Sequence, residues 1–231
     1  MSQTVFKRYE LKYMIDRQQY DQLISVMENY MIRDHFAHSS IHNLYLDTPD
    51  YHLIKTSLEK PVYKEKIRIR SYGDHPDDPD VFVELKKKYH GVVYKRRIEV
   101  IGSIDLYGLD HIDVDQCQIA QEINYVLSYY PMIKPRVFLA YQRDSYQGIQ
   151  DKDLRITFDT NMVYRDHDLS LQRSTRDHPL LTDDHVLMEV KMIRSMPLWL
   201  VHWLSDHTIY KTSLSKYGAA YLSIQDRKEN V

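Results

Sequence analysis

Charged and apolar side chains alternate along several short segments of this sequence, and this alternation constrains the fold more than any other feature. In VFVELKKKY, residues 81–89, Val83 and Leu85 fall on one parity, while Glu84 and Lys86 fall on the other. Successive side chains of a β-strand point to opposite faces, so the segment predicts a strand with one apolar and one charged face. The pattern recurs in RYELKY (8–13), KEKIRIRSY (64–72), VVYKRRIEV (92–100), AYQRDSY (140–146), LRITFD (154–159) and LMEVKM (187–192).

The repetition decides between two interpretations of the charged faces. An antiparallel sheet often exposes one face to water, and this explains any single charged strand. The repeated faces, however, concentrate Arg and Lys around one acid instead of mixing small polar residues. The planar donor fork of Arg suits phosphate oxygens, and a ring of such groups repels itself unless a polyanion lies in the middle. We therefore expect the charged faces to line a polar lumen that binds an anion.

The strand and helix patterns predict an α+β fold, an eight-stranded antiparallel β-barrel with a polar lumen and flanking helices. The expected strands span residues 5–14, 40–47, 62–72, 81–89, 92–101, 135–147, 153–164 and 185–193. The expected helices span about 16–31, where Asp16 can cap the N-terminus, 116–129, 196–209 and 213–225. The segment SYGDHPDDPD (71–80) is typical of a hairpin loop, and no linker or repeat divides the chain. Residues 1–231 are therefore expected to form a single domain.

Charge and cysteine content exclude several classes of protein. The formal net charge of -2 gives no overall attraction to nucleic acid or to an anionic membrane, so any anion site must be local. The basic segments LKKKY and YKRR divide their charges between two faces, and we expect no nucleic-acid partner. Cys117 is the only cysteine, which excludes an intramolecular disulfide and fits a reducing, cytoplasmic location. We expect no signal peptide, because the N-terminal segment MSQTVFKRYELKY is polar and soon becomes strand-like. We expect no membrane segment, because no apolar run approaches ~18 residues.

Two other kinds of site are not indicated by the sequence. No GxxxxGK[ST] motif occurs, which excludes a P-loop. His35, His38 and His42 fall in an expected loop and form no recognised ligand pattern, so we expect no zinc site. Cys117 has no catalytic partner nearby in the sequence and is expected to be a packing residue.

The segments with charged faces also carry a family resemblance. They occur in the order FKRYELKY, KIRIRSYG, VFVELKKK followed by GVVYKRR, AYQRDSY followed by LRITFDT, LMEVKM, and SLSKYGAAY. This order resembles the VTC domain of polyphosphate polymerases, which belongs to the CYTH-like superfamily of triphosphate tunnel metalloenzymes. The resemblance covers roughly residues 5–222. Each motif alone is weak, whereas their common order and compatible spacing are specific.

The resemblance implies an antiparallel tunnel that binds ATP, triphosphate or polyphosphate, and an enzyme that transfers the terminal phosphate of ATP to a growing polyphosphate chain. Taken with the parity of the strands, it gives a set of expected catalytic residues: Lys12, Arg68, Arg70, Lys86, Lys95, Arg143, Arg155 and Lys216. The expected phosphate-binding residues are Tyr141, Arg97, Lys66, Ser215 and Lys191. Lys216 rests on the resemblance alone.

The resemblance further implies a divalent metal, Mn²⁺ or Mg²⁺, bound by oxygen ligands. Glu189 is the expected metal ligand, helped by Glu10, Glu84 or Asp159. Relatives in the family often work beside membrane proteins, which leaves room for a membrane protein as a partner.

Two departures from the family patterns narrow the interpretation. Many CYTH relatives have two alternate glutamates before a lysine, whereas RYELK has Arg8 at the first of these positions. This favours the VTC branch over the cyclase and thiamine-triphosphatase branches. The segment LIKTSLEKPVYKEK lacks an arginine expected before the RIR strand, and Lys55, Lys60 or Lys66 could replace it. Lysine has no bidentate fork, so this departure bears on catalysis more than on binding.

Three functions remain open on the sequence. Phosphoryl transfer depends mainly on positioning and charge neutralisation, and either water or the end of a phosphate chain can attack. The leading hypothesis is a polyphosphate polymerase. The alternatives are a hydrolase of tripolyphosphate or nucleoside triphosphate with the same fold, and a non-catalytic polyphosphate sensor.

Overall fold

The computed structural model describes residues 9–73, 81–100 and 117–230, and these residues form two compact units. The first unit comprises residues 1–39, 141–162 and 181–214, and the second comprises 40–140, 163–180 and 215–231. Three strands pass from one unit into the other along the chain: β2 (Met31–Asp47), β6 (Lys134–Gly148) and β7 (Arg155–Arg165). The single domain that we expect from the sequence stays a prediction.

The strands form an antiparallel sheet, with the order β10-β1-β9-β7-β6-β2-β3-β4-β5 and with β8 paired to β7. The other strands are β1 (Tyr9–Asp16), β3 (Tyr63–Tyr72), β4 (Val81–Tyr89), β5 (Val92–Val100), β8 (His178–Pro179), β9 (His185–Met192) and β10 (Lys211–Thr212). The predicted antiparallel sheet with flanking helices is confirmed, but the eight-stranded closed barrel is not. The described chain has ten strands, and the strand order ends at β10 and β5 without closing.

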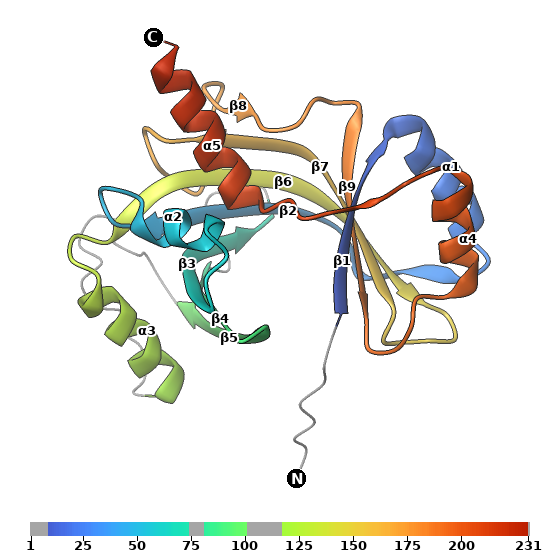
Figure 1. The fold of residues 1–231 in the computed structure, drawn as a ribbon, viewed down its shortest axis with the longest axis horizontal. Coiled ribbons are helices and arrows are strands. Elements are labelled where there is room, and N and C mark those ends of the chain that lie inside the picture. The colour runs from blue at the N-terminus through green and yellow to red at the C-terminus, as the bar shows by residue number, and fades with distance from the viewer. Residues whose placement is uncertain (1–8, 74–80, 101–116, 231) are drawn as a thin grey trace. The chain divides into compact units, whose positions relative to one another are not determined.

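The first unit buries the apolar parity of its strands beneath two helices, α1 (Arg17–Met27) and α4 (Leu198–Asp206) (Figure 1). Asp16 caps α1 as expected, since its Oδ1 accepts from the Gln19 backbone N at 2.7 Å while the Gln19 side chain accepts from the Asp16 N. Leu23 of α1 and Leu200 of α4 share one core with Phe158 of β7. The apolar faces of β1, β7 and β9 are therefore the packed faces of this unit.

The second unit buries the apolar parity of β3 and β4 against α3 (Gln118–Tyr129), which lies beside these strands in Figure 1. Ile67, Ile69, Val83 and Leu85 are each at most 1% exposed and belong to the same core as Ile123 of α3. This unit also contains α2 (His52–Leu58) and α5 (Lys216–Glu229). The charged parity of β3 and β4 is thereby left on the face opposite to the core.

Several local predictions need correction. Residues 31–39, expected to end a helix and continue as a loop, begin β2, so His35, His38 and His42 lie on a strand. Helix α2 was not expected, because seven residues are too few to show a helical period. β8 and β10 were not expected either, since two residues cannot show alternation. None of the helices in the described chain is long and apolar enough to span a membrane.

Candidate functional site

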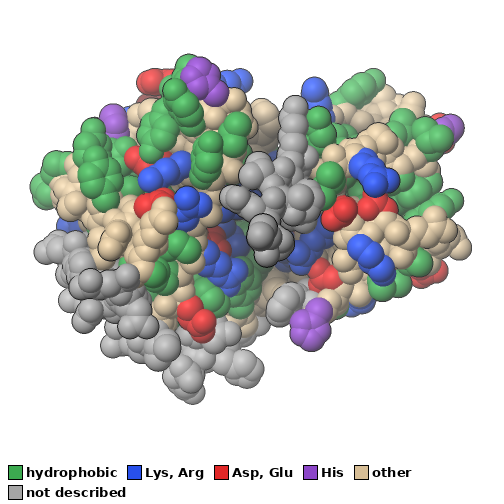
Figure 2. Space-filling view, turned by 90° about the horizontal axis from the view of Figure 1, so that it is seen from below, with side chains coloured by type: hydrophobic (Ala, Val, Ile, Leu, Met, Phe, Trp, Pro, Cys, Tyr) green, Lys and Arg blue, Asp and Glu red, His purple; other side chains and the backbone are tan. Residues whose placement is uncertain are grey.

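The predicted site residues fall into two clusters, one in each unit. The first cluster contains Glu10, Lys12, Tyr141, Arg143, Arg155, Glu189 and Lys191. The second cluster contains Lys66, Arg68, Arg70, Glu84, Lys86, Lys95, Arg97, Ser215 and Lys216. Figure 2 shows one face of the molecule, on which Lys and Arg side chains lie among Asp and Glu side chains instead of forming a surface of one sign.

The second cluster is built on the charged face of β3, β4 and β5, where the register aligns side chains in three rungs. Residues directly opposite one another in an antiparallel pair share a face, so each rung presents three side chains together. The rungs are Lys66–Lys86–Lys95, Arg68–Glu84–Arg97 and Arg70–Phe82–Glu99. Six of the nine side chains are cationic and two are carboxylates. This face therefore carries a local excess of positive charge on a chain with almost no net charge.

Glu84 lies at the centre of these rungs and is surrounded by arginines. Arg68 donates from Nε and Nη2 to Glu84 Oε2 at 2.8 and 2.5 Å. Nη1 of Arg70 and Nη1 of Arg97 each lie 3.8 Å from a Glu84 oxygen. Burial raises the pKa of Glu84, but the arginine charges outweigh burial and lower the pKa overall. These surroundings fit a counter-ion that fixes guanidinium groups better than the metal ligand that we expected from the sequence.

Tyr45 of β2 is a site residue that sequence reasoning missed. Its hydroxyl accepts a hydrogen bond from Arg68 Nη1 at 3.0 Å, and its ring stacks on Tyr217 of α5 with 4.3 Å between centroids. Burial raises the pKa of Tyr45, but the charges of Arg68, Lys66 and Arg70 and the hydrogen bond from Arg68 lower it to about 8. The alternation in NLYLD (43–47) places Tyr45 on the polar side of its strand, but only the register of β2 and β3 shows that it lies opposite Arg68.

Asp47 holds the Tyr45–Tyr217 pair in place within the second unit. The Tyr217 hydroxyl donates to Asp47 Oδ2 at 2.8 Å. The fully buried carboxylate of Asp47 also accepts from the backbone N–H groups of Thr48, Leu53 and Ile54, at 2.8–3.0 Å. Since the Leu53 and Ile54 groups belong to the first turn of α2, Asp47 acts at the N-terminus of that helix. The stacked rings beneath Arg68 are thus held by both α2 and α5.

The N-terminus of α5 brings a second group of predicted residues to the cluster. Ser215 caps the helix by accepting from the Gly218 N at 3.2 Å, and its Oγ also accepts from Lys66 Nζ at 2.9 Å. Lys216, the first residue of α5, is 9% exposed. The positive end of the helix and these two lysines favour an anion at this place. Lys86 and Lys95 are exposed on the first rung.

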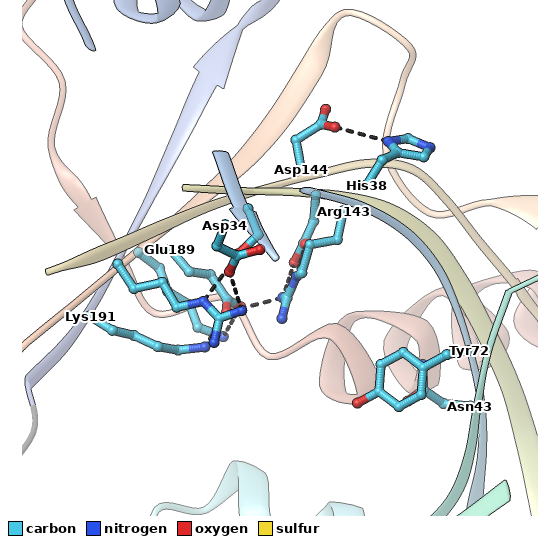
Figure 3. A network of polar contacts seen from close by, with 12 residues as sticks. Asp34, His38, Asn43, Tyr72, Arg143, Asp144, Glu189 and Lys191 are labelled. Atoms are coloured by element: carbon cyan, nitrogen blue, oxygen red, sulfur yellow. Dashed lines mark hydrogen bonds and ion pairs between the residues drawn. The ribbon is translucent and has the colours of Figure 1, made fainter. Parts of the chain in front are cut away.

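The first cluster is arranged around Glu189 of β9. Its carboxylate lies 3.3 Å from Lys12 Nζ, 3.2 Å from Arg143 Nη2 and 3.6 Å from Lys191 Nζ. Figure 3 shows Arg143, Glu189 and Lys191 pointing toward one another. The register accounts for the arrangement, because Lys12 of β1 lies directly opposite Glu189. Three cations from different strands therefore share one nearly buried carboxylate.

Arg143 and Arg155 each have a further acidic partner in the first unit. Arg143 makes a two-point contact with Asp159 and lies over the ring of Tyr141, 5.3 Å from its centroid. Burial lowers the pKa of Arg143, but Asp159 and its other anionic neighbours raise the pKa above its usual value. Arg155 pairs with Asp34 of β2. Asp34 was not identified from the sequence, because Arg155 is remote from it along the chain.

The donor set is small for a divalent metal. Within residues 9–73, 81–100 and 117–230, no group of three or more His, Cys, Asp or Glu could hold a metal ion. Lys12 Nζ lies 3.9 Å from Glu10 and 3.3 Å from Glu189, so both expected ligands are near a cation. Mg²⁺ commonly binds through one or two carboxylates together with substrate phosphates. Glu10 and Glu189 therefore fit a divalent metal only together with a bound phosphate, which supplies the other oxygen ligands.

Comparisons with known proteins agree on the kind of fold. The sequence profile of the VTC domain family matches residues 7–225. A structure of a proposed adenylate cyclase from Bacillus halodurans has a TM-score of 0.52 and 15% identity, covering 89% of this chain and 92% of that chain. A Hippeastrum protein, proposed as an adenylyl cyclase and described as having a dominant triphosphatase activity, has a TM-score of 0.51 and 12% identity, covering 93% and 95%. No curated protein matches the sequence significantly.

Proposed function

This chain belongs to the VTC domain family, and from that premise we propose that it is a polyphosphate polymerase. The reaction transfers the terminal phosphate of ATP to the end of a polyphosphate chain. The observation that carries the proposal is the charged face of β3, β4 and β5, with six cations and two carboxylates in three adjacent rungs. A polyanion offsets this excess of positive charge, whereas a neutral ligand does not.

The fixed orientation of the cations supports a catalytic use. Phosphoryl transfer has a loose transition state, so catalysis is mainly positioning and neutralisation of the phosphoryl oxygens. Glu84 and Tyr45 hold the guanidinium of Arg68, and Asp159 and Glu189 hold that of Arg143. Groups held in this way need little reorganisation during the reaction, which is the condition for electrostatic catalysis.

A divalent metal, Mn²⁺ or Mg²⁺, is proposed as the cofactor, with Glu189 and Glu10 as its protein ligands. When bound, the metal would neutralise negative charge on the phosphate oxygens. Lys12 and Lys191 beside Glu189 are proposed to bind phosphate, and Ser215 and Lys66 are proposed to do so in the second unit. The membrane-protein partner and the cytoplasmic location stay predictions.

The test is incubation of the purified chain with ATP and Mn²⁺ or Mg²⁺, followed by electrophoresis for long polymer and by measurement of free phosphate. Long polymer would support the polymerase. Free phosphate without polymer would instead identify a hydrolase, and tight binding of tripolyphosphate without turnover would identify a sensor. Failure to bind any of these anions would contradict all three functions.

A further inference from the structure

One side chain in the three rungs on the charged face of β3, β4 and β5 is uncharged. Of the nine residues in the three rungs, eight carry a charge, and Phe82 alone carries none. Phe82 is half-buried and lies on the same face as Arg70 and Glu84, not on the core face with Val83. An aromatic ring does not bind phosphate, so this position indicates a contact with another part of a ligand or with a neighbouring side chain.

Arg97 lies over this ring and also contacts a second aromatic side chain. Its guanidinium carbon is 3.5 Å from the Phe82 centroid, and its Nη1 donates to the Tyr72 hydroxyl at 3.3 Å. The rings of Tyr72 and Phe82 meet edge to face, 5.9 Å apart. The Arg97 side chain remains 43% exposed, so its planar group is supported on one side and accessible to a ligand. We call Tyr72, Phe82 and Arg97 the aromatic group.

The aromatic group is joined directly to the cations of the second cluster. Nη1 of Arg70 also donates to the Tyr72 hydroxyl at 3.3 Å, and Arg70 and Arg97 share Glu84 at 3.8 Å. A ligand whose phosphates contact Arg68 and Arg70 would therefore have its next portion beside Tyr72 and Arg97. Bases stack well on aromatic rings and on arginine planes, and such contacts tolerate different bases.

We propose that Tyr72, Phe82 and Arg97 form a nucleobase-binding subsite, in which the base of a nucleoside triphosphate stacks on the Arg97 guanidinium. The inference rests on the proposed function, because it takes the phosphates of the same nucleotide to be bound by the second cluster. It assigns Arg97 to the base, in place of the phosphate contact that we expect from the sequence. The subsite distinguishes ATP, which carries a base, from tripolyphosphate, which carries the same phosphate chain without one.

The test compares the affinities of ATP and tripolyphosphate by calorimetry in one buffer, for the unchanged protein and for two variants. Phe82→Leu removes the ring, and Arg97→Lys keeps the charge but removes the planar stacking group. Loss of the base-stacking contact in Arg97→Lys predicts a fall of roughly tenfold in the ratio of ATP affinity to tripolyphosphate affinity. Phe82→Leu removes the ring that supports Arg97 and should lower the same ratio. The matched control is Arg96→Lys, since Arg96 is the adjacent residue on β5 and pairs with Glu122 of α3. That variant should keep the ratio of the unchanged protein.

The possible outcomes distinguish a failure of the subsite from a failure of the proposed function on which it rests. An unchanged ratio in Phe82→Leu and Arg97→Lys, with both ligands still bound, would overturn the subsite alone. Equal weakening of both ligands would show that Arg97 binds phosphate and would also overturn it. An unchanged protein that binds neither ATP nor tripolyphosphate would overturn the proposed function and the subsite together.

Discussion

Arg143 and Asp159 form a two-point ion pair within the first unit, with Nε 2.5 Å from Oδ1 and Nη2 2.7 Å from Oδ2. The Asp159 side chain is fully buried, and that of Arg143 is 16% exposed. Breaking a buried pair by removing one charge leaves the other charge uncompensated, which is costlier than losing a surface pair. The pair is therefore as much a structural element as a means of orienting Arg143.

Replacement of Asp159 by Asn should lower the free energy of unfolding by about 3 kcal/mol, because Arg143 loses its main counter-charge. Denaturant unfolding followed by circular dichroism measures the change. The matched control is Asp168→Asn, because Asp168 pairs with Arg176 where both side chains are about two-thirds exposed. An exposed pair is worth at most about 1 kcal/mol. Equal costs for the two variants would contradict the structural role of the buried pair.

The sequence predicts the faces of the sheet well because strand alternation is a local property. Parity alone separates Ile67 and Ile69, in the core, from Arg68 and Arg70 on the charged face. The local sequence also predicts the Asp16 cap of α1, because its partner Gln19 is only three residues away. The closure of the sheet could not be predicted in the same way, since it depends on pairing between strands that are distant in the chain.

The partners of the site residues could be predicted only in part, for the same reason. The alternation identifies Arg68 and Arg155 as members of charged faces. It does not identify Tyr45, which is 23 residues from Arg68, or Asp34, which is 121 residues from Arg155. The role of Glu84 depends likewise on the register of three strands. Its three arginine neighbours, which a single strand does not show, favour a counter-ion over a metal ligand.

Arg68 should be essential for binding polyanions by the second cluster. Arg68→Ala removes a guanidinium that Glu84 and Tyr45 hold in place, and it leaves the negative charge of Glu84 less neutralised. We expect the affinity for tripolyphosphate to fall at least about tenfold, since one charge-assisted hydrogen bond contributes about 1.5–3 kcal/mol. Calorimetric titration measures this loss. Arg96→Ala, on the opposite face of β5, should leave the affinity unchanged, and equal affinities in Arg68→Ala and the unchanged protein would count against the proposed site.

Tyr45 should make the stability of the protein depend on pH in the alkaline range. Its pKa falls from 10.0 to about 8 in the folded protein, so the folded state releases this proton more readily than the unfolded chain does. The resulting stabilisation is complete above the unfolded pKa and is lost as the pH falls through about 8. It amounts to about 3 kcal/mol. We expect the difference in unfolding free energy between the unchanged protein and Tyr45→Phe to grow from pH 7 to pH 10. A constant difference would show that the Tyr45 hydroxyl keeps its proton.

Glu189 should be required for binding a divalent metal, and only when phosphate is present. Three cations surround its carboxylate, so Mn²⁺ alone meets repulsion there, whereas bound tripolyphosphate offsets these charges and supplies further oxygen ligands. We expect titration of Mn²⁺ into the complex with tripolyphosphate, followed by electron paramagnetic resonance, to show binding beyond that of free tripolyphosphate. Glu189→Gln should lose this additional binding by about tenfold or more. Glu99→Gln, which removes an exposed carboxylate from the second unit, is the control and should retain it. If Glu189→Gln binds Mn²⁺ as the unchanged protein does, the metal is held by other groups, and Glu189 serves only to orient Lys12 and Arg143.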